Sequence, residues 1–173
     1  DLGQNADNFY ASNPVKAIPY MVEIRQRLVN AMSEEFRSIY RENLYRIGLA
    51  YMRCFQETGN REQLKLAIPY WDEFINDFIS DERHRLAMLN RADSYYGAEN
   101  WLAAISNYQH VLQLYTEQLE VDDLLIVLER LLAAATNLND VESILSTLRG
   151  FLEPVHDSEL RLLAMNALMD QFL

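Results

Sequence analysis

A short run of residues recurs along this chain with nearly the same letters. Residues 16–20 read Lys-Ala-Ile-Pro-Tyr, residues 66–70 read Leu-Ala-Ile-Pro-Tyr, and a more distant relative at residues 104–108 reads Ala-Ile-Ser-Asn-Tyr. Each copy carries an alanine followed by a tyrosine within a segment of helical character. Repetition at a period of about 20 to 50 residues is typical of arrays built from one supersecondary unit. We therefore expect an array of similar units, a class of protein that usually works by presenting a surface.

The composition predicts an all-α protein. The chain has 173 residues, half of them hydrophobic, and only five glycines and four prolines are present to build turns and loops. This length suits one domain with a substantial core, and the hydrophobic content is too high for a disordered chain. Residue types that favour helices, such as leucine, alanine, glutamate and arginine, dominate the sequence.

Charge and hydropathy narrow the classes of function. The formal net charge of −11 disfavours a nucleic-acid partner, because duplex binding needs a basic surface that displaces counterions. No apolar run approaches the roughly 18 residues that a membrane span needs, so we expect a soluble protein. The single cysteine, Cys54, is expected to be a buried structural thiol. Because the chain opens with Asp1 rather than Met, we expect a processed protein or a piece of a longer one.

Hydrophobic spacing predicts about eight helices joined by short turns. Residues 1–12 are polar and lack an apolar stripe, so we expect no helix there. The predicted helices cover residues 13–32, 33–55, 64–78, 81–95, 101–115, 122–137, 141–152 and 157–173. Short connections favour antiparallel neighbours, as in stacked helical hairpins.

The best-defined repeat unit runs from Met88 to Tyr115. Ala92 is the small residue of its first helix, Ala104 is the small residue of its second helix, and Tyr108 is large enough to fill a neighbouring gap. In this pattern the chain resembles tetratricopeptide repeats, whose unit of about 34 residues contains two antiparallel helices. Small residues let the helices approach closely, and large ones fill the holes between hairpins. The resemblance implies antiparallel helical hairpins stacked in a right-handed solenoid.

The resemblance also implies a domain organisation. Residues 1–12 would be a polar N-terminal segment, residues 13–156 the repeat array, and residues 157–173 a capping helix. Within the array, the expected units are a partial one at 13–32 and three others at 34–79, 82–119 and 122–153. The stretch from Tyr95 to Trp101 also looks like bacterial envelope repeat proteins that attend outer-membrane assembly. This likeness leaves the bacterial periplasm and the cytoplasm open as locations.

No pattern of residues predicts catalysis, a metal site or a cofactor. The histidines His84, His110 and His156 are scattered, and none of them lies at ligand spacing from an acid. Phosphate-binding glycine loops, zinc-protease motifs and nucleophile elbows are missing from the sequence. Acidic pairs at residues 34–35 and 122–123 stand at predicted helix starts, where the helix dipole explains them. We expect a protein that is not an enzyme.

In tetratricopeptide proteins the first helix of each hairpin lines the inner, concave surface. Carried over to this chain, the resemblance implies a partner-binding face made of Tyr45, Leu49, Met52, Arg53, Leu89, Asp93, Tyr96 and Glu129. Aromatic residues, methionine and arginine are enriched in protein interfaces. Because the positions that clamp a peptide carboxylate in some relatives carry other residue types here, we expect no such clamp. The implied function is a non-catalytic scaffold that presents this face to a peptide or helix of a partner protein.

Other interpretations stay open. The chain's own segments, such as residues 1–12 or the final helix, could cover the face. The chain could be a structural or oligomerisation segment of a larger repeat protein and form homo-oligomers. It could also be a helical regulatory domain that responds to a small ligand held between hairpins.

Overall fold

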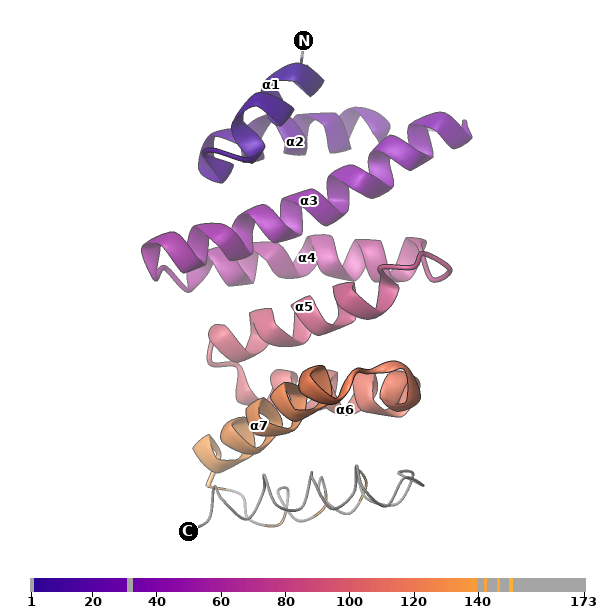
Figure 1. Ribbon diagram of the computed structural model, residues 1–173. Coiled ribbons are helices and arrows are strands. Elements are labelled where there is room, and N and C mark those ends of the chain that lie inside the picture. Colours follow the sequence, from indigo (N-terminus) through magenta and orange to yellow (C-terminus); the bar gives the residue numbers. More distant parts are fainter. Residues whose placement is uncertain (1, 31–32, 140–141, 143–145, 147–149, 151–173) are drawn as a thin grey trace. The chain divides into compact units, whose positions relative to one another are not determined.

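The computed structural model describes residues 2–30, 33–139, 142, 146 and 150, and the described residues are helical with no β-strand (Figure 1). The helices are α1 (Leu2–Tyr10), α2 (Pro14–Leu28), α3 (Glu34–Thr58), α4 (Glu62–Asp77), α5 (His84–Gly97), α6 (Trp101–Tyr115) and α7 (Val121–Asn137), with a 3-10 helix, η1 (Thr116–Gln118), before α7. The prediction of an all-α fold is confirmed. The chain divides into two compact units, Asp1–Ala98 and Glu99–Leu173.

Helices α2 to α7 correspond to the first six predicted helices, which run from residues 13–32 to residues 122–137. The helix predicted over residues 157–173 lies outside the described residues. Of residues 141–152, the structure describes residues 142, 146 and 150. The predicted count of about eight helices and the domain boundaries beyond residue 139 therefore stay predictions.

The prediction that residues 1–12 form no helix is wrong, because Leu2–Tyr10 form α1. Ala6 of this helix is 2% exposed, and Phe9 and Tyr10 pack against the same core cluster. The stripe was missed because it consists of one small residue and two aromatic ones rather than aliphatic side chains. A signal was nevertheless present: residues 6–11 read Ala-Asp-Asn-Phe-Tyr-Ala, and residues 92–97 in α5 read Ala-Asp-Ser-Tyr-Tyr-Gly.

Local chemistry sets the helix ends where the sequence indicated them. The side chain of Asn13 accepts a hydrogen bond from the Lys16 backbone N–H at 3.1 Å, and Pro14 fills the first position of α2. Ser33 caps α3 by accepting from the backbone N–H of Phe36. Gly59 ends α3 with a left-handed φ of 67°, a conformation that favours glycine.

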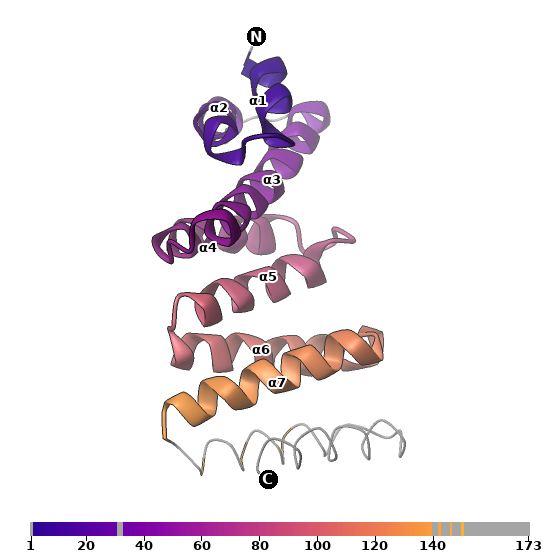
Figure 2. The ribbon, with the colours of Figure 1, turned by 60° about the vertical axis from the view of Figure 1, so that its left-hand side comes forward.

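In the first unit each helix packs against its neighbours in sequence, so that α1, α2, α3, α4 and α5 follow one another through the unit (Figures 1 and 2). Small residues allow close approach at the contacts: Ala17 in α2 and Ala67 in α4 are fully buried. Gly48 in α3 faces Trp71 in α4, and a Cβ atom added at Gly48 would lie 2.5 Å from a ring carbon of that tryptophan. The glycine is therefore required for this helix contact.

Two stacked pairs of aromatic rings make the repetition visible in three dimensions. Phe9 of α1 stacks on Tyr20 of α2 with ring centroids 6.0 Å apart and planes inclined by 15°. Tyr51 of α3 stacks on Tyr70 of α4 at 5.8 Å and 25°. The pairs α1–α2 and α3–α4 thus use the same kind of ring contact, and the second ring of each pair, Tyr20 or Tyr70, holds the matching place in the repeated sequence.

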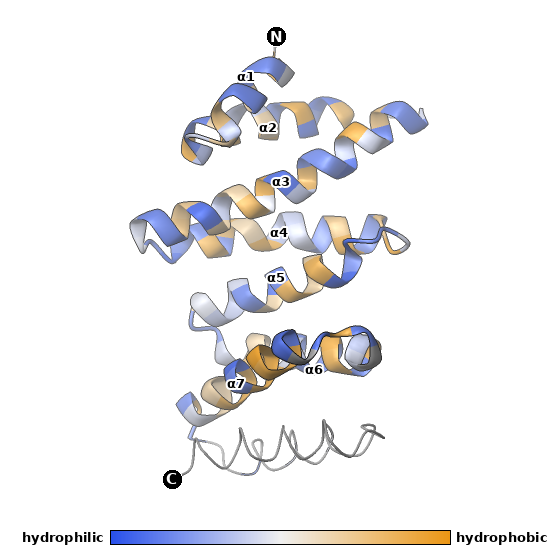
Figure 3. Ribbon diagram, viewed as in Figure 1, coloured by the Kyte–Doolittle hydropathy of each residue, from blue (hydrophilic) through white to orange (hydrophobic). Residues whose placement is uncertain are grey.

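The second unit contains α6, η1 and α7, and α6 packs against α7. Ala104 and Tyr108 in α6 are fully buried, as are Leu131 and Ala135 in α7. The prediction that the repeated alanines belong to the core is confirmed for Ala104 as it is for Ala67. Figure 3 shows hydrophilic and hydrophobic residues interleaved along the helices, and none of the described helices is long and apolar enough to cross a membrane.

The contact between Gly48 and Trp71 gives a first prediction. Gly48→Ala would raise helix propensity, yet we expect it to lower the free energy of unfolding by about 1 to 3 kcal/mol, because the new methyl group overlaps the indole ring. Urea unfolding followed by circular dichroism measures the change. In a Trp71→Phe background the same substitution should cost less, because the nearest ring atoms are gone. An equal cost in both backgrounds would contradict this interpretation of the contact.

Candidate partner-binding face

A surface groove of about 340 Å³ lies among α1, α3 and α5 in the first unit. We name it the α1–α3–α5 groove. Its lining residues are Tyr10 from α1, Leu49, Ala50, Met52, Arg53 and Gln56 from α3, and Asn90 from α5. Leu49, Met52 and Arg53 all belong to the face that the sequence predicted, and the structure brings them together at this groove.

The groove combines an apolar floor with polar edges. Leu49 and Met52 are half-buried, whereas Arg53 and Gln56 are exposed. Arg53 pairs with Glu57 one turn along α3, with Nε 3.2 Å from Oε1, and its Nη1 donates to the backbone carbonyl of Tyr10 at 3.4 Å. Such a surface offers hydrophobic contact together with hydrogen-bond donors and acceptors, the combination found in binding sites.

Helix α1 forms one side of the groove and is held there by Arg46 of α3. The Arg46 guanidinium pairs with Asp7 at 2.6 Å and lies 4.2 Å from the centroid of the Tyr10 ring. Burial raises the pKa of Tyr10, and the positive charge of Arg46 opposes that rise. One alternative is that residues 1–12 cover the predicted face. In the structure, α1 borders this face and leaves the groove open beside it.

Tyr45 is fixed by contacts within the protein. Its ring meets Trp71 edge-on at a centroid distance of 5.4 Å and Phe74 at 5.2 Å, and the Arg83 guanidinium lies 4.8 Å from its ring centroid. Burial is the main reason that the pKa of Tyr45 is raised. The side chain thus stabilises the packing of α3 on α4 and on the start of α5.

The other predicted face residues do not line the groove. Leu89, Asp93 and Tyr96 are partly buried on α5, and Asp93 and Tyr96 both interact with other residues of the chain. Glu129 is exposed on α7 and belongs to the second unit. Sequence reasoning missed Tyr10 because residues 1–12 were not expected to be helical. It also missed Gln56 and Asn90, whose residue types carry no signal of their own.

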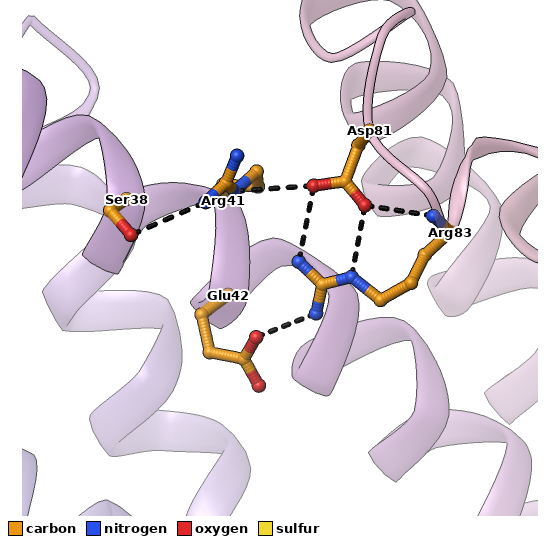
Figure 4. A network of polar contacts seen from close by, with 5 residues as sticks. All are labelled: Ser38, Arg41, Glu42, Asp81 and Arg83. Atoms are coloured by element: carbon orange, nitrogen blue, oxygen red, sulfur yellow. Dashed lines mark hydrogen bonds and ion pairs between the residues drawn. The ribbon is translucent and has the colours of Figure 1, made fainter.

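A polar network ties the start of α5 to α3 (Figure 4). Arg83, just before α5, places Nε 3.0 Å from Asp81 Oδ1 and Nη1 2.6 Å from Glu42 Oε2. Arg41 of α3 adds a second cation, with Nε 3.3 Å from Asp81 Oδ2. Because Glu42 and Arg41 belong to α3, the network sets where α5, and with it Asn90, lies relative to α3.

Asp81 is an ionised carboxylate in this network. Its side chain is 5% exposed, and burial by itself would raise the pKa. Hydrogen bonds from the side chain and backbone N–H of Arg83, together with the charges of Arg83 and Arg41, outweigh burial and hold the pKa of Asp81 below its ordinary value. The network is therefore intact at neutral pH.

His84, His110 and Cys54 lie in the described part of the chain. His84 is buried, with Nε2 3.2 Å from the carbonyl oxygen of Ile75, and His110 is exposed on α6. His156 lies outside the described residues. Burial raises the pKa of the Cys54 thiol. Within the described part of the chain, no group of three or more His, Cys, Asp or Glu side chains is arranged to hold a metal ion.

Comparisons of this chain with protein-family models, with curated proteins and with solved structures find no match.

The network around Asp81 predicts a large stability difference. Arg83→Met should lower the free energy of unfolding by about 3 kcal/mol at neutral pH, because it leaves the nearly buried Asp81 carboxylate without its main partner. Arg27→Met is a matched control, since Arg27 makes an exposed ion pair with Glu23, and should cost at most about 1 kcal/mol. Urea unfolding measures both variants, and equal effects would count against the network.

The lowered pKa of Asp81 predicts how this difference changes with pH. The unfolded chain binds the Asp81 proton near its ordinary pKa of about 3.9, whereas the folded protein binds it only at lower pH. The stabilisation is therefore fully present above about pH 4 and is lost as the pH falls through the folded-state pKa. The difference between wild type and Arg83→Met should shrink below about pH 4 in unfolding measurements across acid pH. A difference that stays constant or grows would overturn the assignment.

Proposed function

We propose that this protein is a non-catalytic interaction scaffold, a tetratricopeptide-like array of helix pairs that binds a peptide or helix of a partner protein in the α1–α3–α5 groove. The observation that carries the proposal is that α1, α3 and α5 meet at this groove. These helices stand at alternating positions in the chain, as the first helices of successive pairs would. Family resemblance assigns the partner surface to the first helices.

The repetition of contacts supports the array. Helices α1 and α2 pack together around buried Ala6 and Ala17, and α3 and α4 pack together around Gly48 and Ala67. Each pair adds a stacked pair of rings at comparable distance, 6.0 Å in the first and 5.8 Å in the second. Sequential packing of this kind is typical of solenoids, in which each unit contacts its neighbours.

The groove has the chemistry of a surface that binds peptides. Met52 is flexible and polarisable, so it can adapt to partner side chains of different shape. The amide side chain of the exposed Gln56 can donate and accept hydrogen bonds, which suits the backbone of a bound segment. The groove volume of about 340 Å³ is within the range of binding pockets and is large enough for an anchoring side chain.

A charge placed in the groove tests the proposal. Short peptides are first selected from a random library on the intact chain. They should bind Met52→Glu at least about tenfold more weakly than wild type, because the substitution places a carboxylate among the apolar side chains that line the groove. Fluorescence anisotropy measures the affinities, and circular dichroism verifies that the variant is folded. Leu66→Glu is the matched control, since Leu66 is 49% exposed on α4 and does not line the groove. Peptides that bind Met52→Glu as tightly as wild type would exclude the groove as the binding site.

A further inference from the structure

Arg53 is the charged residue among those that line the α1–α3–α5 groove. Its side chain is 45% exposed, and its partner Glu57 is 47% exposed. The distance of 3.2 Å between them is longer than the 2.7 to 2.9 Å that is usual for a charge-assisted hydrogen bond. An exposed pair on adjacent turns of a helix is weak, so Arg53 can exchange Glu57 for another carboxylate.

The backbone carbonyl of Tyr10 holds the guanidinium at the groove without using up its donors. Nη1 of Arg53 donates to this carbonyl at 3.4 Å, and Nε faces Glu57. A guanidinium is planar and presents several N–H groups, which allows two parallel hydrogen bonds to one carboxylate. Leu49, Ala50 and Met52 line the groove beside it. A cation thus stands next to an apolar floor.

The whole chain limits how acidic the occupant can be. The formal net charge of −11 would repel a strongly acidic partner at long range. A segment with a single carboxylate next to a large apolar side chain suits both the positive charge of Arg53 and the negative net charge of the chain. Its carboxylate pairs with Arg53, and its apolar side chain covers Leu49 and Met52. A basic segment would instead meet Arg53 with like charge.

Building on the proposed function, we infer that the groove selects a peptide segment in which a large apolar side chain lies close to one Asp or Glu. The apolar side chain packs on Leu49 and Met52. The carboxylate pairs with the Arg53 guanidinium and displaces Glu57 from it.

The test uses short peptides selected from a random library on the intact chain, with affinities measured by fluorescence anisotropy. The selected peptides should share an acidic residue near a large apolar one. Arg53→Gln should weaken their binding about tenfold, because the charged hydrogen bonds are lost. Glu57→Gln should strengthen binding about twofold, because it removes the competitor for Arg53. These opposite changes distinguish recognition of a carboxylate from a loss of structure.

Matched controls separate the contact from a general effect of charge. Glu23 and Arg27 form an exposed ion pair on α2, and neither residue lines the groove. Glu23→Gln and Arg27→Gln change the net charge by the same amounts, and each should alter the affinity by less than about twofold. Replacing the peptide's acid by its amide should weaken binding to wild type and leave binding to Arg53→Gln unchanged.

The outcomes separate this inference from the proposed function. If Met52→Glu abolishes binding but the peptides bind equally well with an acid or an amide, the carboxylate inference is overturned and the proposed function stands. If no peptide is selected, or if the selected peptides are indifferent to both Met52→Glu and Arg53→Gln, both proposals are overturned.

Discussion

The close contact between α3 and α4 at Gly48 and Trp71 is the constraint on which the first unit depends. Three atoms of the indole ring would lie within 2.7 Å of a Cβ atom at Gly48, so the helices reach this separation only with glycine there. The buried Trp71 then supports the ring of Tyr45, which also packs against Phe74. A single small residue therefore organises an aromatic cluster that joins the two helices.

Polar contacts fix the other helices of the unit onto α3. The buried side chain of Asn43 donates to the backbone carbonyl of Met21 at 2.6 Å and thereby orients α2. Glu73 of α4 accepts from Arg25 of α2 at 2.6 Å and from the hydroxyl of Tyr40. Because a buried polar group left unpaired is costly, such contacts favour one register of the helices over others.

Helix α3 is consequently the element around which the groove is built. Arg46 holds α1 on one side, and Arg83 connects the start of α5 to Glu42 on the other. The part of α3 that follows these attachments carries the half-buried Leu49 and Met52 and the exposed Arg53. The same helix thus provides both the scaffold for its neighbours and the surface proposed to bind a partner.

The periodic part of this architecture could be predicted from the sequence. Helical spacing and capping residues such as Asn13 and Ser33 located the helices, and the repeated alanines marked buried positions such as Ala67. These features are local or repetitive, so they leave a trace in the order of residues.

The contacts that shape the groove left no such trace. Arg83 pairs with Glu42, far away along the chain, only because the packing of three helices brings them together. Tyr45 was predicted to face a partner, but its place beside Trp71 depends on how closely α3 approaches α4. Pairings between distant residues follow from the fold and could not be obtained from spacing alone.

Close packing of small residues between helices holds the first unit together, and the unfolding free energy of Ala67→Leu tests this most directly. Ala67 is fully buried, whereas Asn76 on the same helix is exposed and provides the control Asn76→Leu. We expect Ala67→Leu to lower the free energy of unfolding by about 1 to 3 kcal/mol, because the larger side chain forces the helices apart. Asn76→Leu should leave it within about 0.5 kcal/mol. An Ala67→Leu variant as stable as the wild type would show that the fold does not depend on close packing at this alanine.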